Sequence, residues 1–216
     1  MRVLILAVLM AYSSLCRADI PLPILTKAKA AFEQHYPNSR FHEYASAFGD
    51  LNGDEVTDFV TFIGDPYYND NGVEDLKIVV FFGAKENIFD FYEISLEVLG
   101  HERVTQYLDI ERQSIFLRRS GSGGCCSRWG EEFQFKIRNG QLKLIGLETT
   151  NLYQKGNISG TDYGVSANLL SGRVTKWTGT GKGRREKKMT VPTLKPLPFK
   201  DFDYNTFTDK WSSVLW

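Results

Sequence analysis

Residues 50–58 read Asp-Leu-Asn-Gly-Asp-Glu-Val-Thr-Asp, and the run Phe59-Val60-Thr61-Phe62 follows them. Oxygen-bearing side chains stand at loop positions 1, 3, 5 and 9, and the backbone carbonyl of position 7 adds another oxygen. A tightly turning backbone directs residues with this spacing at one hard cation. The sequence therefore predicts a calcium loop, and the expected ligands are Asp50, Asn52, Asp54, the Val56 carbonyl and Asp58.

We expect this loop to open a β-strand and not a helix. An EF-hand loop ends in a bidentate Glu at position 12 and continues as a helix, whereas position 12 here is Thr61, inside an alternating run. The competing interpretation is a metal-free turn, because Asp and Asn side chains accept hydrogen bonds from nearby backbone amides in such turns. The strand that follows favours the metal site.

The same stretch carries a resemblance to a known family. Asp-Leu-Asn-Gly-Asp, an Asp four residues later and an apolar strand are similar to the calcium loop of FG-GAP or VCBS-type repeats, over about residues 46–63. The resemblance implies an extracytoplasmic β protein that binds calcium. The family usually has Gly where this chain has Glu55, at a sharp turn that strains a residue with a Cβ. Gly53, two residues earlier, is expected to take up part of that turn.

A second resemblance covers much of the remaining chain. Together with the loop, four motifs resemble secreted bacterial proteins of uncharacterised function: Phe-x-Phe-x-Ile at 133–137, Asn139-Gly140, Leu-x-Leu-Ile-Gly at 142–146 and Ser-x-Asn-Leu-Leu-Ser-Gly at 166–172. These motifs concern the fold and imply no activity.

The composition is that of a globular chain. Of 216 residues, 42% are hydrophobic and 24% are charged, which is enough apolar sequence for one sizeable core. Lys and Arg total 26, as do Asp and Glu, so the net charge gives no reason to expect nucleic acid as a partner. No internal repeat accompanies the single loop, so a complete propeller is not supported.

The N-terminus has the pattern of a signal peptide. Arg2 is followed by an apolar run from Val3 to Leu15 and by a small residue, Ala18, at which cleavage is expected. A lipoprotein anchor at Cys16 is the alternative, although Leu15 is bulkier than the residue usual before such a cysteine. We therefore expect residues 1–18 to be removed and residues 19–216 to form one β-rich domain in the periplasm or outside the cell.

The elements expected in that domain are one helix and a series of hairpins. Residues 19–23 are expected to be extended, and apolar residues at helical spacing predict a helix over about 24–36. Alternating segments and turn residues then predict antiparallel strands near 56–63, 76–82, 89–96, 115–117, 132–137, 141–146, 174–178 and 187–191. The tail from 192 to 216 is expected to be extended, with its aromatic residues anchored on the core. The fold class is mainly β, an antiparallel meander that is propeller-blade-like or a sandwich or barrel.

Two further segments are candidates for interactions. Cys125 and Cys126 are adjacent, and in an oxidising compartment they allow a strained vicinal disulfide, two free thiols or pairing with another chain. A basic cluster could meet anionic lipid, a cell-wall polymer or an acidic protein, although such clusters are more often solvated turns. Its members are Lys182, Arg184, Arg185, Lys187 and Lys188.

Signatures of catalysis are sparse. Only three histidines are present, without the spacing of a metal site, and no nucleophile motif is found. Arg118, Arg119 and Arg128 flank the Gly-Cys-Cys loop and could bind an anion, but a solvated hairpin end is favoured. We therefore expect a non-catalytic, calcium-stabilised binding protein, in a sharper form an immunity or inhibitor protein for a secreted toxin or hydrolase. The alternative is a hydrolase of envelope polymers.

Overall fold

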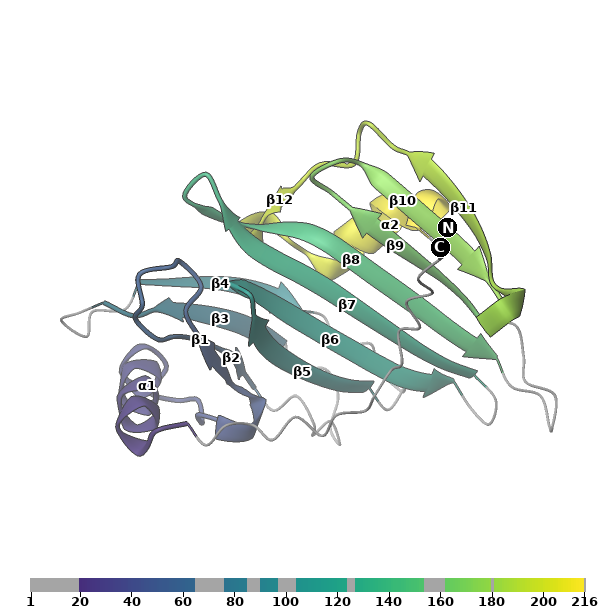
Figure 1. Ribbon diagram of the computed structural model, residues 1–216. Helices are drawn as coiled ribbons and strands as arrows, with labels where there is room; N and C mark the ends of the chain where they lie inside the picture. The colour runs from purple at the N-terminus through teal and green to yellow at the C-terminus, as the bar shows by residue number, and fades with distance from the viewer. Residues whose placement is uncertain are drawn as a thin grey trace, which may run out of the picture.

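Two antiparallel sheets and two α-helices make up the computed structural model, which describes residues 20–64, 76–84, 90–96, 104–123, 127–153, 162–179 and 181–215 (Figure 1). The smaller sheet runs in the order β1 (Ala47–Gly49), β2 (Asp58–Ile63), β3 (Leu76–Phe82) and β4 (Asp90–Leu96). The larger sheet has eight described strands. Seven of them run in the order β11 (Arg185–Thr190), β10 (Arg173–Thr178), β9 (Tyr163–Asn168), β8 (Gln141–Tyr153), β7 (Ser127–Arg138), β6 (Ser114–Gly123) and β5 (Val104–Glu111). The eighth, β12 (Leu197–Pro198), pairs with β8 beside this series. The expected class, mainly β with antiparallel hairpins, is confirmed.

The smaller sheet is a meander in chain order, covered on both faces. Helix α1 (Leu22–His35) places Phe32 on one face, where Phe59 of β2 and Phe81 of β3 stack with their ring centroids 4.5 Å apart. The alternate residues of β2 and β3, such as Val60 and Val80, join the core that the two sheets share. Burial on both faces explains why β3 is almost entirely apolar, as its sequence predicts.

Helix α1 begins earlier than expected. Residues 22 and 23 were expected in an extended lead, but the helix starts at Leu22 with Pro23 in its first turn. A proline is tolerated there because the first-turn amides have no partner within the helix. Within the described residues, no helix combines the length and the apolar character needed to cross a membrane.

The long hairpin of β7 and β8 forms the middle of the larger sheet. Asn139 and Gly140 connect the strands with φ values of 53° and 71°, the left-handed pair that a two-residue hairpin turn requires. The strands continue well beyond the predicted segments, to Ser127 and Tyr153. The predicted pairing of the strands near 174–178 and 187–191 is also present, as β10 and β11.

The expectation of an extended tail is wrong for its second half. After the short helices η1 (Glu43–Ala45) and η2 (Gly181–Gly183), the chain forms η3 (Phe199–Asp201) and ends in α2 (Tyr204–Leu215). The amide of Thr206 donates to Asp203 Oδ1 over 2.7 Å and caps α2. Tyr204, Phe207 and Trp211 recur at the spacing of one helix face. The prediction of an extended tail treated these residues only as anchors and did not use their spacing.

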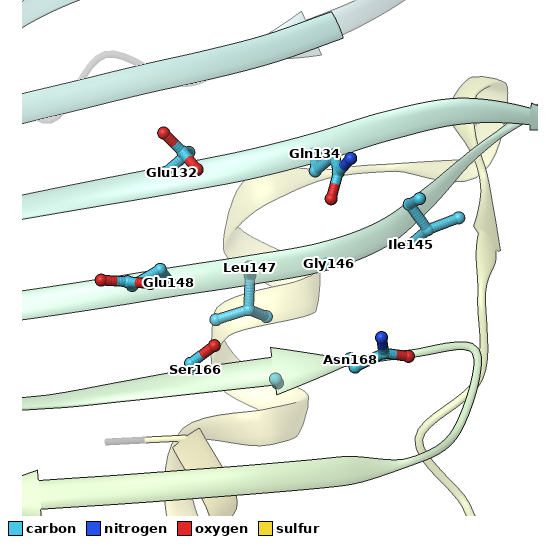
Figure 2. Close-up of a pocket in the computed structure, with 9 residues that line it drawn as sticks. Glu132, Gln134, Ile145, Gly146, Leu147, Glu148, Ser166 and Asn168 are labelled. Atoms are coloured by element: carbon cyan, nitrogen blue, oxygen red, sulfur yellow. The ribbon is translucent and has the colours of Figure 1, made fainter. Parts of the chain in front are cut away.

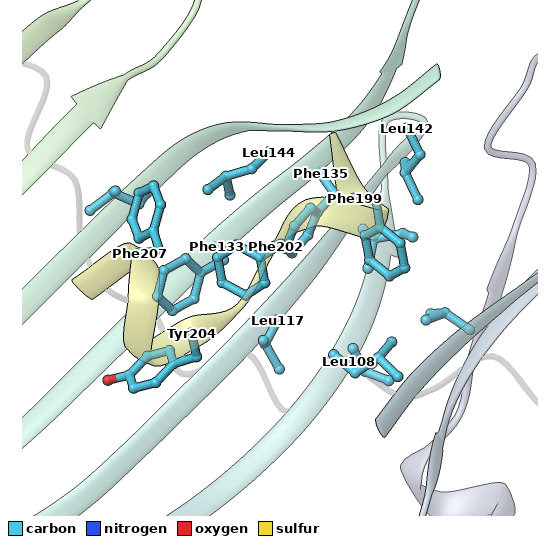
Figure 3. Close-up of a cluster of buried hydrophobic side chains, with 14 of the residues drawn as sticks. Leu108, Leu117, Phe133, Phe135, Leu142, Leu144, Phe199, Phe202, Tyr204 and Phe207 are labelled. Carbon is cyan, nitrogen blue, oxygen red and sulfur yellow. The ribbon is translucent and has the colours of Figure 1, made fainter. Parts of the chain in front are cut away.

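The aromatic residues of this tail do anchor on the core, as expected. Figure 3 shows Phe199, Phe202, Tyr204 and Phe207 against the larger sheet. Phe202 lies 5.4 Å from Phe133 and 5.3 Å from Phe135 between ring centroids. The C-terminal segment therefore fills the inner face of the larger sheet, the face that carries alternate residues of β6, β7 and β8.

Candidate functional site

The predicted calcium loop connects β1 and β2. These strands pair through Gly49 and Asp58, so residues 50–57 form the closed end of a hairpin. Asp58 is fully buried at its neck. Its Oδ2 accepts the Leu51 amide at 2.7 Å, and its Oδ1 accepts the Gly83 amide at 2.8 Å. One carboxylate thus ties the start of the loop to the end of β3.

The other predicted side chains accept amides of the loop itself. Asp50 accepts from Gly53 at 2.6 Å and from Glu55 at 3.1 Å, while Asn52 accepts from Asp54 at 3.0 Å. Asp54 in turn accepts from the Val56 amide at 2.8 Å. These bonds hold the loop in its tight turn. The same bonds are those of a metal-free turn rich in Asp and Asn.

Glu55, where Gly is usual in the loops that this one resembles, has a left-handed backbone. Glu55 has φ 65°, and Gly53 has φ 83°. The left-handed region costs a residue with a Cβ about 1 to 2 kcal/mol of conformational energy, whereas glycine adopts it without this cost. In this turn Gly53 is therefore unstrained and Glu55 is strained.

Negative charge accumulates in the loop. Burial raises the pKa of Asp58 from 3.8 to about 6; the amides of Leu51 and Gly83 oppose the rise, and the charges of Asp54 and Asp50 add to it. A cation among these carboxylates would offset both burial and repulsion. The charges of these residues therefore favour a hard cation in the loop.

The ligand set is mixed. Within the described segments, no group of three or more His, Cys, Asp and Glu side chains is arranged to hold a metal ion. A calcium ion in the loop would therefore depend on the Asn52 side chain and the Val56 carbonyl as well, which are oxygen ligands of the kind that calcium accepts.

The basic cluster lies on and beside β11, which has a strand neighbour on one side only among the described strands. Arg184 and Lys188 both contact Glu186, at 3.0 and 3.9 Å, and the Arg184 guanidinium lies 4.5 Å from the Trp177 ring centroid. Arg185 and Lys187 alternate with them and lie on the other face of the strand. Neither has an ion pair within the described part of the chain.

Lys187 has a like-charged neighbour. It pairs in register with Lys176 of β10, and the exposed Lys182 precedes β11 in η2. The described structure thus separates the cluster into a face on which Glu186 offsets charge and a face on which it does not.

Arg119 was expected at a solvated hairpin end, and this expectation is wrong. The residue is 1% exposed and lies on the inner face of β6. Its Nε donates to Gln106 at 3.2 Å and its Nη1 to Glu131 at 3.3 Å, while its guanidinium lies 4.0 Å from the Tyr204 ring centroid. Tyr204 donates to Glu131 at 2.9 Å. We call these four residues the buried polar cluster.

The ionisation states in this cluster follow from burial. Burial raises the pKa of Glu131, and Arg119 and the Tyr204 hydroxyl oppose that rise. Burial also raises the pKa of Tyr204, and the charge of Glu131 raises it further. Tyr204 therefore stays neutral and acts as a donor. Arg119 Nη2 is buried without a hydrogen-bond partner in the described structure, so this ion pair is only partly satisfied.

Arg118 takes the opposite face of β6. It contacts Glu132 at 2.6 Å, Asp109 at 2.9 Å and Glu111 at 3.2 Å. Arg128, the third arginine of this group, is exposed. The three arginines that flank the Gly-Cys-Cys loop therefore have three different surroundings and do not form one anion site.

Several predicted residues lie outside the described ranges. These are the signal segment with Cys16, and Cys125 and Cys126.

Comparison with known proteins adds no relative. No family model, curated protein or solved structure matches the chain.

Proposed function

We propose that this chain is an exported, non-catalytic binding protein, stabilised by a calcium ion at Asp50, Asn52, Asp54, Val56 and Asp58. The observation that carries the calcium part is the buried Asp58 carboxylate, to which Asp50 and Asp54 add negative charge. Export is expected from the N-terminal pattern of residues 1–18. Calcium is plentiful outside cells, where modules of about 0.1 to 1 mM affinity are occupied.

Calcium at this position would act on the fold and not on a reaction. The loop starts β2, a strand buried on both faces, and Asp58 joins the loop to Gly83 at the end of β3. A cation would neutralise the loop charges and hold the hairpin end closed. A ligand that binds only the folded state raises stability according to its concentration and affinity.

The binding surface that we propose is the face of β11 with Arg185 and Lys187. Two exposed cations, Arg185 and Lys187, lie there beside the half-exposed Lys176, and none of the three forms an ion pair with a described acidic group. An acidic surface on a protein partner would be complementary, and such complementarity speeds encounter and gives specificity. A secreted toxin or hydrolase held by an immunity or inhibitor protein is the partner class that suits an exported binder.

The calcium proposal predicts a rise in the unfolding midpoint at pH 7.5 when millimolar calcium replaces chelator. At a concentration of 100 times the dissociation constant the gain is about 2.7 kcal/mol, or roughly 5 to 10 °C for a chain of this size. Asp50→Ala and Asp54→Ala should abolish the rise, whereas Asp201→Ala, an exposed carboxylate elsewhere, should keep it. Thermal unfolding followed by circular dichroism measures it.

The calcium response should also depend on pH. Because the folded-state pKa of Asp58 lies near 6 and not at 3.8, the folded state binds the proton more tightly. Without calcium, this group's contribution to stability therefore falls as the pH rises from about 4 to about 6. Calcium needs the ionised carboxylate, so its effect should shrink at pH 5. Equal midpoints with calcium and chelator at pH 7.5 would mean a metal-free turn.

The partner proposal predicts capture that depends on charge. The immobilised protein should retain an acidic protein from the secreted and envelope fractions of its source. Added salt should release that acidic protein, because salt screens the attraction between the charges. Arg185→Glu with Lys187→Glu should lose it. The matched control, Lys27→Glu with Lys195→Glu, makes the same charge change at exposed lysines away from β11 and should keep it. Retention of the same proteins by both double variants would contradict the assignment of this surface.

A further inference from the structure

The larger sheet has an outer face, opposite the one that α2 covers. Arg119 and Glu131 point to Tyr204 of α2, and residues next to each other in a strand point to opposite faces. Ser120 and Gly130 are therefore on the outer face, where they pair in register. Figure 2 looks onto this face, with the strands in front of α2 and with Glu132, Glu148 and Ser166 along them.

A row of small residues crosses this outer face. The register pairs Thr105 with Ser120, Ser120 with Gly130, Gly130 with Thr150, and Thr150 with Gly164. These five residues lie side by side on five consecutive strands, from β5 to β9. At about 4.8 Å per strand the row is roughly 19 Å long.

A groove of about 800 Å³ lies over this row. Four residues of the row line it, and Trp177, the next residue in register, closes one end. A Cβ at Gly164 would overlap the Trp177 ring, so glycine is required beneath it. The floor therefore consists of glycine backbone and short hydroxyl side chains, while the indole of Trp177 forms an apolar end.

The charged residues that line the groove are balanced. Arg128 and Arg184 contribute two positive charges, and Glu148 and Asp162 contribute two negative charges. Glu148 also borders a smaller hollow of about 220 Å³ (Figure 2). Burial raises the pKa of Glu148, as does the charge of Glu132, while Arg184 opposes the rise. In addition, the Asp162 Oδ1 atom is buried without a hydrogen-bond partner in the described structure.

We propose that this groove binds a neutral oligosaccharide. Hydroxyl groups on the floor both donate and accept hydrogen bonds, as sugar hydroxyls do. The arginines supply further donors and the carboxylates further acceptors, which a polyhydroxyl chain uses without carrying charge. A polyanion would meet Glu148 and Asp162, and a polycation would meet Arg128 and Arg184, so neither fits both sides. The part of the row that lines the groove crosses four strands, roughly 14 Å at about 4.8 Å per strand, which suits a linear chain better than a compact molecule.

This inference goes beyond the proposed function and uses none of the calcium-loop residues. It assigns a second, separate surface to the protein. The glycan proposal and the calcium proposal can therefore fail independently, because glycan binding is measured in saturating calcium and the calcium response is measured without glycan.

The test is calorimetric titration with neutral hexasaccharides: cellohexaose, chitohexaose and maltohexaose. Hexaglutamate and hexalysine peptides are the charged counter-probes. We expect at least one hexasaccharide to bind and neither peptide to bind. Ser122→Tyr, at an exposed residue lining the groove, and Thr150→Tyr on its floor should each raise the dissociation constant by roughly tenfold or more, since they fill the site.

The matched control is Thr175→Tyr. Thr175 pairs with Ser166 on the same outer face but does not line the groove. This variant should bind as the wild type does. Circular dichroism identifies any variant that fails to fold, and Ser122→Tyr, at an exposed position, keeps the test open if Thr150→Tyr unfolds. The proposal is overturned if no hexasaccharide binds at about 5 mM, if a charged peptide binds more tightly, or if Thr175→Tyr weakens binding as much as Ser122→Tyr.

Discussion

Replacing Arg119 with methionine is expected to lower the free energy of unfolding by about 3 to 5 kcal/mol, because it leaves the Glu131 carboxylate buried without its cation. The loss includes the contact of the guanidinium with the Tyr204 ring at 4.0 Å and the bond to Gln106. The side chain of Arg119 is 0% exposed and that of Glu131 is 9% exposed, so water does not replace the lost partner. Urea unfolding of both proteins measures the difference.

The control for this variant is Arg118→Met, one residue away on the outer face. Arg118 contacts three carboxylates, but these are 34% to 39% exposed and remain hydrated when it is removed. Its loss should therefore cost clearly less than the loss of Arg119. The double variant Arg119→Met with Glu131→Leu should recover much of the stability, because it leaves no unpaired buried charge. Equal costs for Arg118→Met and Arg119→Met would contradict the account of the buried polar cluster.

Phe202→Ala should destabilise the protein by about 3 to 5 kcal/mol, the usual cost of removing a buried phenylalanine. Phe202 is 2% exposed. Its ring lies between the rings of Phe133 and Phe135 in the sheet and the ring of Phe207 in α2, and the centroids of the Phe202 and Phe207 rings are 5.7 Å apart. Its removal would leave a cavity where the C-terminal segment meets the larger sheet. Urea unfolding monitored by tryptophan fluorescence measures the cost.

Leu170→Ala provides the comparison for this second variant. Leu170 is 48% exposed, in the turn after β9, and its truncation should change stability by no more than about 0.5 kcal/mol. If Phe202→Ala were as mild as Leu170→Ala, the C-terminal segment would not be part of the core.

The hairpins were predictable where a turn residue marks them. Asn139-Gly140 identifies the β7–β8 turn because both positions need a left-handed backbone, which this pair adopts readily. The turn between β5 and β6 has the same requirement but uses Arg112 and Gln113, with φ 52° and 58°. Neither residue is typical of such a turn, so β5 was not predicted and β6 was reduced to 115–117.

The buried polar cluster could not be predicted, because a charged residue is expected in solvent and its partner lies far away in the sequence. Arg119 has the same parity in β6 as the buried Ile115 and Leu117, which placed it on the inner face. Its charge argued for solvent, and only the approach of Tyr204, 85 residues later in the chain, makes its burial tolerable. A contact at that separation leaves no local pattern in the sequence. By contrast, the loop at 50–58 is local, and the sequence alone predicted that it opens the strand β2, although β1 before it was not predicted.

The cations of β11 also bear on how copies of this chain behave toward each other. Among the described strands, β11 has a neighbour on one side only, and a free strand edge offers backbone groups to which a second chain could add. If two copies joined through β11, lysines and arginines would face one another across the new ladder, and like charges directly opposite are destabilising. The sequence Arg-Glu-Lys-Lys-Met-Thr at 185–190 thus discourages continuous sheet growth from this edge, at a position where an apolar strand would promote aggregation.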